Sequence, residues 1–150
     1  MKIPRAIVAV TITAVLLGAA AAYAQSDYYP TPAQADKLST QLGTAIEHSR
    51  NSAGSNTMSG AVSHLGHVLN CIEGTRGKNF NAAWGHVCQG QGDGIVADIK
   101  GAKNAGSVML VLESANGLAA AGVKAKDLAA VRFAARGVAG LLQVVADATK

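Results

Sequence analysis

Residues 63–93 read SHLGHVLNCIEGTRGKNFNAAWGHVCQGQGD. This stretch holds three of the four histidines, both cysteines and the only tryptophan of the 150-residue chain. Apolar residues recur at helical spacing in its first part, while its second part is rich in Gly, Asn and Gln. The stretch therefore predicts a helix followed by a long loop, and we expect specific binding groups to lie here.

The N-terminus of the chain predicts export. Lys2 and Arg5 precede an apolar run that ends in an A-x-A cleavage signal at residues 22–24. We predict a signal peptide over residues 1–24 and a single mature domain over residues 25–150, located in the periplasm or outside the cell. The apolar run is short and ends in small residues, which disfavours an uncleaved anchor. Because every later helix carries charges, we expect no stable membrane anchor after cleavage.

The composition favours a helical fold. Hydrophobic residues make up 49% of the chain but aromatic residues only 4%, so Ala, Val, Leu and Ile must form the core. Small residues let helices approach closely, which suits a helical bundle better than a β-sandwich. Lys and Arg are scattered, and loss of the signal peptide lowers the formal net charge from +4 to +2. We therefore expect no nucleic-acid partner.

Apolar residues at three- and four-residue spacing predict four helices. We expect them at about residues 32–51, 58–73, 93–121 and 127–149. The short links between most of them predict an all-α, antiparallel four-helix bundle with one long loop between the second and third helices.

Two features stand out in the predicted third helix. Gly101 and Gly106 lie inside it and mark positions where it can bend or break. The run VMLVL at residues 108–112 is apolar on every side, so this part of the helix is predicted to be central.

The long loop is expected to be held by a disulfide. The connection runs over residues 75–94, with Cys71 just before it and Cys88 within it. In an oxidising compartment two cysteines in one exported chain are expected to pair. A loop of this length in a compact domain is usually functional or constrained. The Cys71–Cys88 bond supplies such a constraint.

The histidines of the stretch predict a metal site. His64, His67 and Cys71 share one edge of the second helix, at spacing i, i+3, i+7, beside the core stripe. The disulfide brings Cys88 to this edge, and with it His86, which lies two residues before. Three imidazoles near one point suit Cu, Zn or Ni. We predict a site formed by His64, His67 and His86, with metal buffering or delivery as its role.

Aromatic residues of the loop are expected to shield this site. Phe80 and Trp84 can fold over the same edge of the second helix. His48 lies near the end of the first helix, off its apolar stripe, and is expected to be exposed to solvent.

Alternative functions remain open on the sequence alone. The histidines can be solvated beside a structural disulfide, with Phe80 and Trp84 forming a contact surface for a protein partner. Non-covalent haem binding through His64 or His67 is a third hypothesis, whereas the absence of C-x-x-C-H excludes covalent c-type attachment. No nucleophile motif is present and the cysteines are expected to be paired, so we predict that the protein is not an enzyme.

Overall fold

The computed structural model describes residues 31–150, so the predicted signal peptide lies outside the described range. Within that range all regular secondary structure is helical. Four long helices form the body of the molecule: α1 (Pro32–Gly54), α2 (Met58–Glu73), α4 (Ala105–Gly122) and α5 (Leu128–Ala148). Three short helical segments complete the order: η1 (Ala82–Trp84) in the loop after α2, then α3 (Ile95–Asp98) and η2 (Ile99–Gly101) before α4.

Local sequence signals place the ends of three long helices. Thr31 and Gln34 form a reciprocal capping box at the start of α1, with Pro32 in the first turn. The side chains of Thr57 and Asp127 accept backbone hydrogen bonds at the starts of α2 and α5. Gly74 ends α2 with a φ of 64°, a conformation that residues with a Cβ rarely adopt. The predicted bounds of these helices are confirmed to within about three residues.

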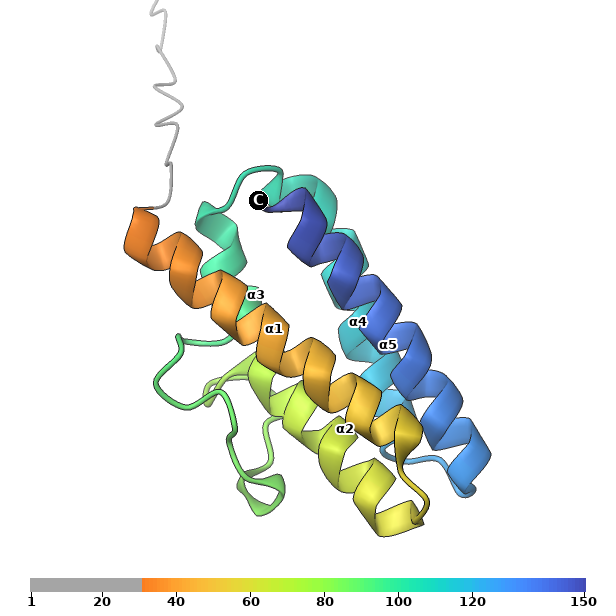
Figure 1. Cartoon of the computed structure of the whole chain (residues 1–150). Helices are drawn as coiled ribbons and strands as arrows, with labels where there is room; N and C mark the ends of the chain where they lie inside the picture. The colour runs from red at the N-terminus through yellow and green to blue at the C-terminus, as the bar shows by residue number, and fades with distance from the viewer. Residues whose placement is uncertain (1–30) are drawn as a thin grey trace, which may run out of the picture.

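The long helices pack around a shared core. α1 packs against both α2 and α5, while α4 packs against α5 and contacts α2. Successive long helices run in opposite directions (Figure 1), and this packing is consistent with the predicted four-helix arrangement. The predicted apolar stripes face the core, whose largest fully buried aliphatic side chains are Leu42, Leu65, Leu69, Ile72, Ile95, Ile99, Leu112, Leu142, Val68, Val131 and Val138.

The predicted third helix is not continuous. The chain turns through α3 and η2, and then Asn104 adopts a left-handed conformation with a φ of 59° before α4 begins. A single helix cannot pass through such a residue, because left-handed backbone breaks the helical hydrogen-bond pattern. The break therefore lies close to Gly101 and Gly106, where the sequence predicted that the helix can bend or break. The residue in left-handed backbone is Asn104, and its side-chain amide donates a hydrogen bond to the Ala148 carbonyl of α5 at 3.1 Å.

The predicted Cys71–Cys88 disulfide is confirmed, with the two Cα atoms 5.3 Å apart. Its position corrects the expectation that Cys71 lies on an edge outside the core, because both cysteines are buried. The Sγ atom of Cys88 lies 3.9 Å from the Gln41 carbonyl of α1. The end of the loop thus packs against α1 and α2. The side of α2 that carries Cys71 is therefore buried, as is the side that faces the helical core.

α4 and α5 carry apolar residues on their outer side. Leu110, predicted to be central, is 70% exposed, and Phe133 and Val144 are exposed as well. Among the described helices, α5 alone is long and apolar enough to cross a membrane by length and composition. α5 meets this criterion although it carries charged residues, whereas the sequence analysis expected charges to exclude every later helix as a membrane span. In the structure the buried side of α5 packs against α1 and α4.

Candidate metal centre

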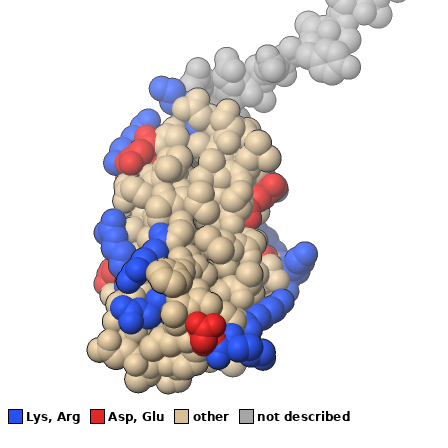
Figure 2. All heavy atoms as spheres, turned by 90° about the vertical axis from the view of Figure 1, so that its right-hand side faces the viewer, with Lys and Arg blue, Asp and Glu red and all other residues tan. Residues whose placement is uncertain are grey.

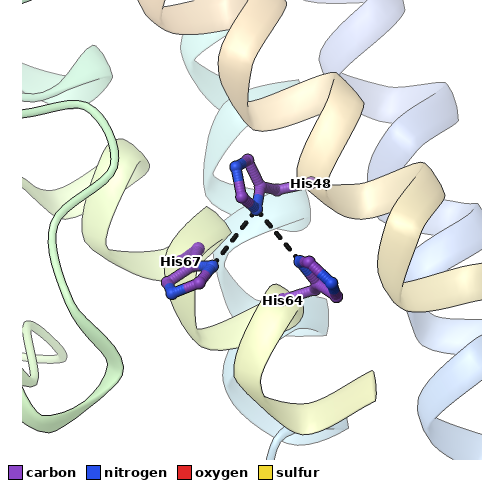
Figure 3. A group of neighbouring side chains, drawn as sticks. All are labelled: His48, His64 and His67. Carbon is purple, nitrogen blue, oxygen red and sulfur yellow. Dashed lines mark hydrogen bonds between the residues drawn. The ribbon is translucent and has the colours of Figure 1, made fainter. Parts of the chain in front are cut away.

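Three histidines converge where α1 and α2 pack against each other. His48 comes from the second half of α1, and His64 and His67 come from neighbouring turns of α2. Their rings point toward one another (Figure 3). The three residues form a group in which one ligand atom from each lies within 4.8 Å of the others.

The register of the two helices explains why His48 takes part. Near the α1–α2 turn, the buried hydroxyl of Ser52 donates to the Ala61 carbonyl at 2.7 Å. The two helices run in opposite directions (Figure 1). One turn back along α1 from Ser52 is His48, and about one turn forward along α2 from Ala61 is His64. The packing of α1 on α2 therefore brings His48 level with the histidine pair of α2.

The Nδ1 atom of His48 is the centre of the group. It lies 3.1 Å from Nδ1 of His64 and 3.1 Å from Nδ1 of His67. The ring centroids are separated by 5.3 Å for His48–His64, 4.8 Å for His48–His67 and 5.8 Å for His64–His67. All three side chains are partly buried, so the group is sheltered but reachable from solvent.

Burial favours the neutral form of two of these rings. It lowers the pKa of His48 below the ordinary value of 6.5, and the nearby His67 and His64 lower this pKa further, against a smaller opposing effect of Glu47. Burial also lowers the pKa of His67, a hydrogen bond to the backbone of Trp84 raises it, and His64 lowers it. A depressed pKa keeps the lone pair of an imidazole available near neutral pH, which metal ligation requires.

Two of the three nitrogen separations are close to those found around a small metal ion. Zn–N bonds are about 2.0–2.1 Å, so two nitrogens of a tetrahedral site lie roughly 3.3–3.4 Å apart. The two 3.1 Å separations are close to this value. Without a metal, neighbouring Nδ1 atoms at this distance must share a proton, since two facing lone pairs repel. In place of such shared protons, the group could hold a metal ion through His48, His64 and His67.

The fourth histidine lies outside the group. The ring of His86 packs edge-on against Phe80 with centroids 5.4 Å apart, and its Nδ1 atom is buried without a hydrogen-bond partner. Along a helix with a rise of 1.5 Å per residue, Cys71 lies about 10 Å beyond His64. The disulfide therefore ties Cys88, near the end of the loop, to the far end of α2, and the His86 ring turns to Phe80. Of the predicted ligands His64, His67 and His86, the structure brings together the first two and adds His48.

His48 and the two loop aromatic residues differ in part from expectation. His48 is partly buried and contacts two other histidines, which corrects its predicted solvent exposure. Trp84 does cover the region of His67: a Cβ atom built on Gly66, the residue before His67, would overlap its indole ring. Phe80 contacts His86 instead of the histidine group.

Sequence reasoning missed Asn70, which is fully buried in α2. Its amide nitrogen donates to the carbonyls of Asn81 and Gly85 at 2.8 and 2.6 Å, and its carbonyl oxygen accepts from the Asn81 backbone N–H at 2.9 Å. The signal was present, since asparagine is a poor helix former and here it stands between Leu69 and Cys71. A polar residue at such a buried helix position is expected to make specific hydrogen bonds.

A separate cleft of about 560 Å³ opens between the start of α1, the end of the loop and the α3–η2 segment. Lys37, Asp98 and Lys100 are among its lining residues, and no histidine lines it. The Asp98 carboxylate is already engaged by the Gln41 amide at 2.6 Å and the Asp93 N–H at 2.9 Å. This cleft is therefore distinct from the histidine group.

Comparison with known proteins adds no relative: no family model, no curated protein and no solved structure matches the chain.

Proposed function

We propose that this protein binds one transition-metal ion of the Cu, Zn or Ni type through His48, His64 and His67. The convergence of three imidazole Nδ1 atoms from two packed helices is the observation that carries the proposal. Neutral imidazoles are borderline ligands that suit these metals and do not suit Mg²⁺ or Ca²⁺. The antiparallel four-helix bundle is, in this proposal, the rigid frame on which the ligands are mounted.

The proposed role is buffering or delivery of the metal in the periplasm or outside the cell. Three protein ligands leave at least one coordination position for water or for a donor from another molecule. Partial exposure of all three histidines leaves a path for the ion to exchange. Export is expected from the N-terminal sequence, which would place the protein where it meets incoming metal ions.

A non-catalytic role is part of the proposal. The cysteines are paired in the disulfide, so neither is a thiolate nucleophile. The Glu73 carboxylate accepts hydrogen bonds from the side-chain amides of Asn79 and Asn116 at 2.5 and 2.7 Å, so this carboxylate has a structural role. No carboxylate in the described residues joins the histidine group.

The test is isothermal titration of the purified, oxidised protein with Cu²⁺, Zn²⁺, Ni²⁺ and Co²⁺. Single substitutions His48→Gln, His64→Gln and His67→Gln each remove one ligand and are expected to weaken binding of the preferred metal at least about 100-fold. His86→Gln is the matched control and is expected to bind as tightly as the parent protein. Binding no tighter than millimolar, or equal binding in all four variants, would contradict the proposal.

Exposed apolar side chains on α4 and α5 support a second candidate function, docking of a protein partner. Leu110 of α4 and Phe133 and Val144 of α5 are exposed, and the Arg136 guanidinium lies 5.5 Å from the centroid of the Phe133 ring. Figure 2 shows a broad uncharged area, with Lys, Arg, Asp and Glu lying mostly around it and no large single-sign patch. Capture of a periplasmic partner by the parent protein and by the His48→Gln variant, but not by Phe133→Ser, would favour this function over metal binding.

A further inference from the structure

The cleft beside the start of α1 adjoins a second cavity at the same end of the molecule. The cleft, of about 560 Å³, lies between the start of α1, the end of the loop and the α3–η2 segment. The second cavity, of about 240 Å³, lies between the first half of α1, Ala102 and residues 146–150. Gln34 and Asp98 line both spaces, so the two meet at these residues. The volume of the cleft lies in the range of small-molecule sites.

A buried polar residue builds the wall of the cleft that carries Asp98. Gln41 is fully buried in α1; its side-chain nitrogen donates to Oδ2 of Asp98 at 2.6 Å, and its side-chain oxygen accepts from the Gly94 N–H at 3.1 Å. The Asp93 N–H donates to the same Oδ2 atom at 2.9 Å. A Cβ atom on Gly92 would overlap both the Gln41 amide and the Asp98 carboxylate, so glycine is needed for this close approach. The loop end, α1 and α3 are thus fixed to one another around Asp98.

The partly buried Asp98 carboxylate offers an anionic acceptor to the cleft. Both of its hydrogen bonds end on Oδ2, and both come from neutral amides. Within residues 31–150, no Lys, Arg or His forms an ion pair with it, and Oδ1 receives no hydrogen bond. Such a carboxylate suits an ammonium group, because charge-assisted hydrogen bonds are about twice as strong as neutral ones.

Two lysines and an apolar cavity supply the other groups that a ligand would meet. Lys37 of α1 and Lys100 of η2 line the cleft, and neither forms an ion pair with another described residue. Their ammonium groups suit a carboxylate. Apolar side chains line much of the smaller cavity next to Asp98, namely those of Ala35, Leu38, Leu42, Ala102 and Ala146. These groups match a molecule that carries an ammonium, a carboxylate and an apolar chain.

We propose that this cleft binds a small zwitterion of the free amino acid class with an apolar side chain. Asp98, held in place by Gln41, binds the ammonium group, and Lys37 and Lys100 bind the carboxylate. The smaller cavity takes the apolar side chain, since it meets the cleft at Asp98. The inference is independent of the proposed metal site, because none of the described histidines lines either cavity.

The first experiment is isothermal titration of the oxidised, metal-free protein with L-valine, L-leucine and L-phenylalanine in turn. Metal is removed because amino acids themselves chelate transition-metal ions. We expect at least one of the three to bind with a Kd below about 1 mM. Its N-acetyl derivative lacks the ammonium group, its amide lacks the carboxylate and glycine lacks the side chain, so each should bind at least about 10-fold more weakly. Failure of all three to bind, or equal binding of the N-acetyl derivative, would overturn the proposal.

Substitutions then locate the site. Asp98→Asn keeps the size of the side chain and removes its charge, and it should weaken binding of the amino acid about 10-fold or more. Glu113→Gln, on an exposed position of α4 outside both cavities, is its matched control and should change nothing. The double variant Lys37→Gln/Lys100→Gln should weaken binding of the amino acid but not of its amide, which has no carboxylate to lose. Lys103→Gln is the control for the lysines, since Lys103 is exposed and lines neither cavity.

The outcomes separate this site from the metal centre. His48→Gln is expected to bind the amino acid as the parent does, and loss of binding in this variant would assign the ligand to the histidine group and overturn the inference. A protein that binds the amino acid but no metal refutes the proposed function and keeps the inference. Unchanged affinity in a folded Asp98→Asn variant overturns the inference alone. Should Asp98→Asn fail to fold by circular dichroism, the comparison of the amino acid with its N-acetyl derivative on the parent protein decides.

Discussion

At the scale of single residues, the histidine group couples folding to pH. Burial lowers the folded-state pKa of His48 and His67, so the unfolded chain binds more protons than the folded chain below about pH 6.5. The stability contributed by the neutral rings is fully present above the unfolded pKa. It is lost as the pH falls below that value toward the depressed folded pKa.

The expected result is that the urea midpoint of the metal-free protein falls between about pH 7.5 and pH 5. The variant with both His48→Gln and His67→Gln lacks these two groups, so its midpoint should change less over the same interval. Equal pH dependence in the two proteins would show that the histidine group is not the source. Urea unfolding followed by circular dichroism provides the measurement.

At the scale of an element, Asn104 is the residue at which the chain breaks between η2 and α4. Asn104 combines a left-handed backbone with a side-chain hydrogen bond to the end of α5. Asparagine tolerates this backbone better than most residues, and glycine tolerates it best. Asn104 therefore breaks the predicted continuous helix and also ties the start of α4 to the last turn of α5.

Two substitutions separate these contributions. Asn104→Gly keeps the backbone freedom and removes the hydrogen bond, and we expect it to cost roughly 1 kcal/mol of unfolding free energy. Asn104→Ala removes the bond and strains the backbone, so it should cost about 1–2 kcal/mol more than the glycine variant. Denaturant unfolding checks both values. Lys103→Ala, at an exposed neighbouring position, serves as the control and is expected to stay within about 0.5 kcal/mol of the parent.

At the scale of the whole molecule, metal binding should stabilise the fold, because the ligands come from α1 and α2 and are together only when these helices pack. A ligand at about 100 times its Kd adds about 2.7 kcal/mol. For a domain of this size that corresponds to a rise in Tm of roughly 10 °C. Differential scanning calorimetry with and without the preferred metal checks it.

The control for this shift is again a histidine variant. His48→Gln should show at most a small rise in Tm on addition of metal, whereas the Tm of His86→Gln should rise as that of the parent does. A full shift in His48→Gln would mean that the metal stabilises the protein from another position, such as a site that uses His86.

Much of the architecture could be predicted from the sequence because it depends on short-range signals. Helix starts follow from Thr31, Thr57 and Asp127, whose side chains cap neighbouring N–H groups. The end of α2 follows from Gly74. The disulfide follows from having two cysteines in a chain expected to be exported. The break at Asn104 was harder to predict, since it depends on a contact with Ala148, 44 residues away.

Two of the three candidate ligands could be predicted by the same reasoning. His64 and His67 lie three residues apart on one helix, and helical geometry alone puts them side by side. The third ligand had to come from elsewhere in the chain. The sequence suggested His86, which the disulfide ties to α2, because a covalent bond is the one long-range contact that residue types indicate directly.

The sequence by itself therefore determined α1, α2 and α5 with their N-caps, the disulfide and one pair of histidines, since each depends on residues within a few positions or on a bond between the only two cysteines. The tertiary structure alone decided that His48 joins this pair and that Asn70 orders the loop beside it. Both outcomes depend on how α2 packs against α1 and against the returning loop. Such packing is set by many weak contacts acting together, and no local pattern of residues records it.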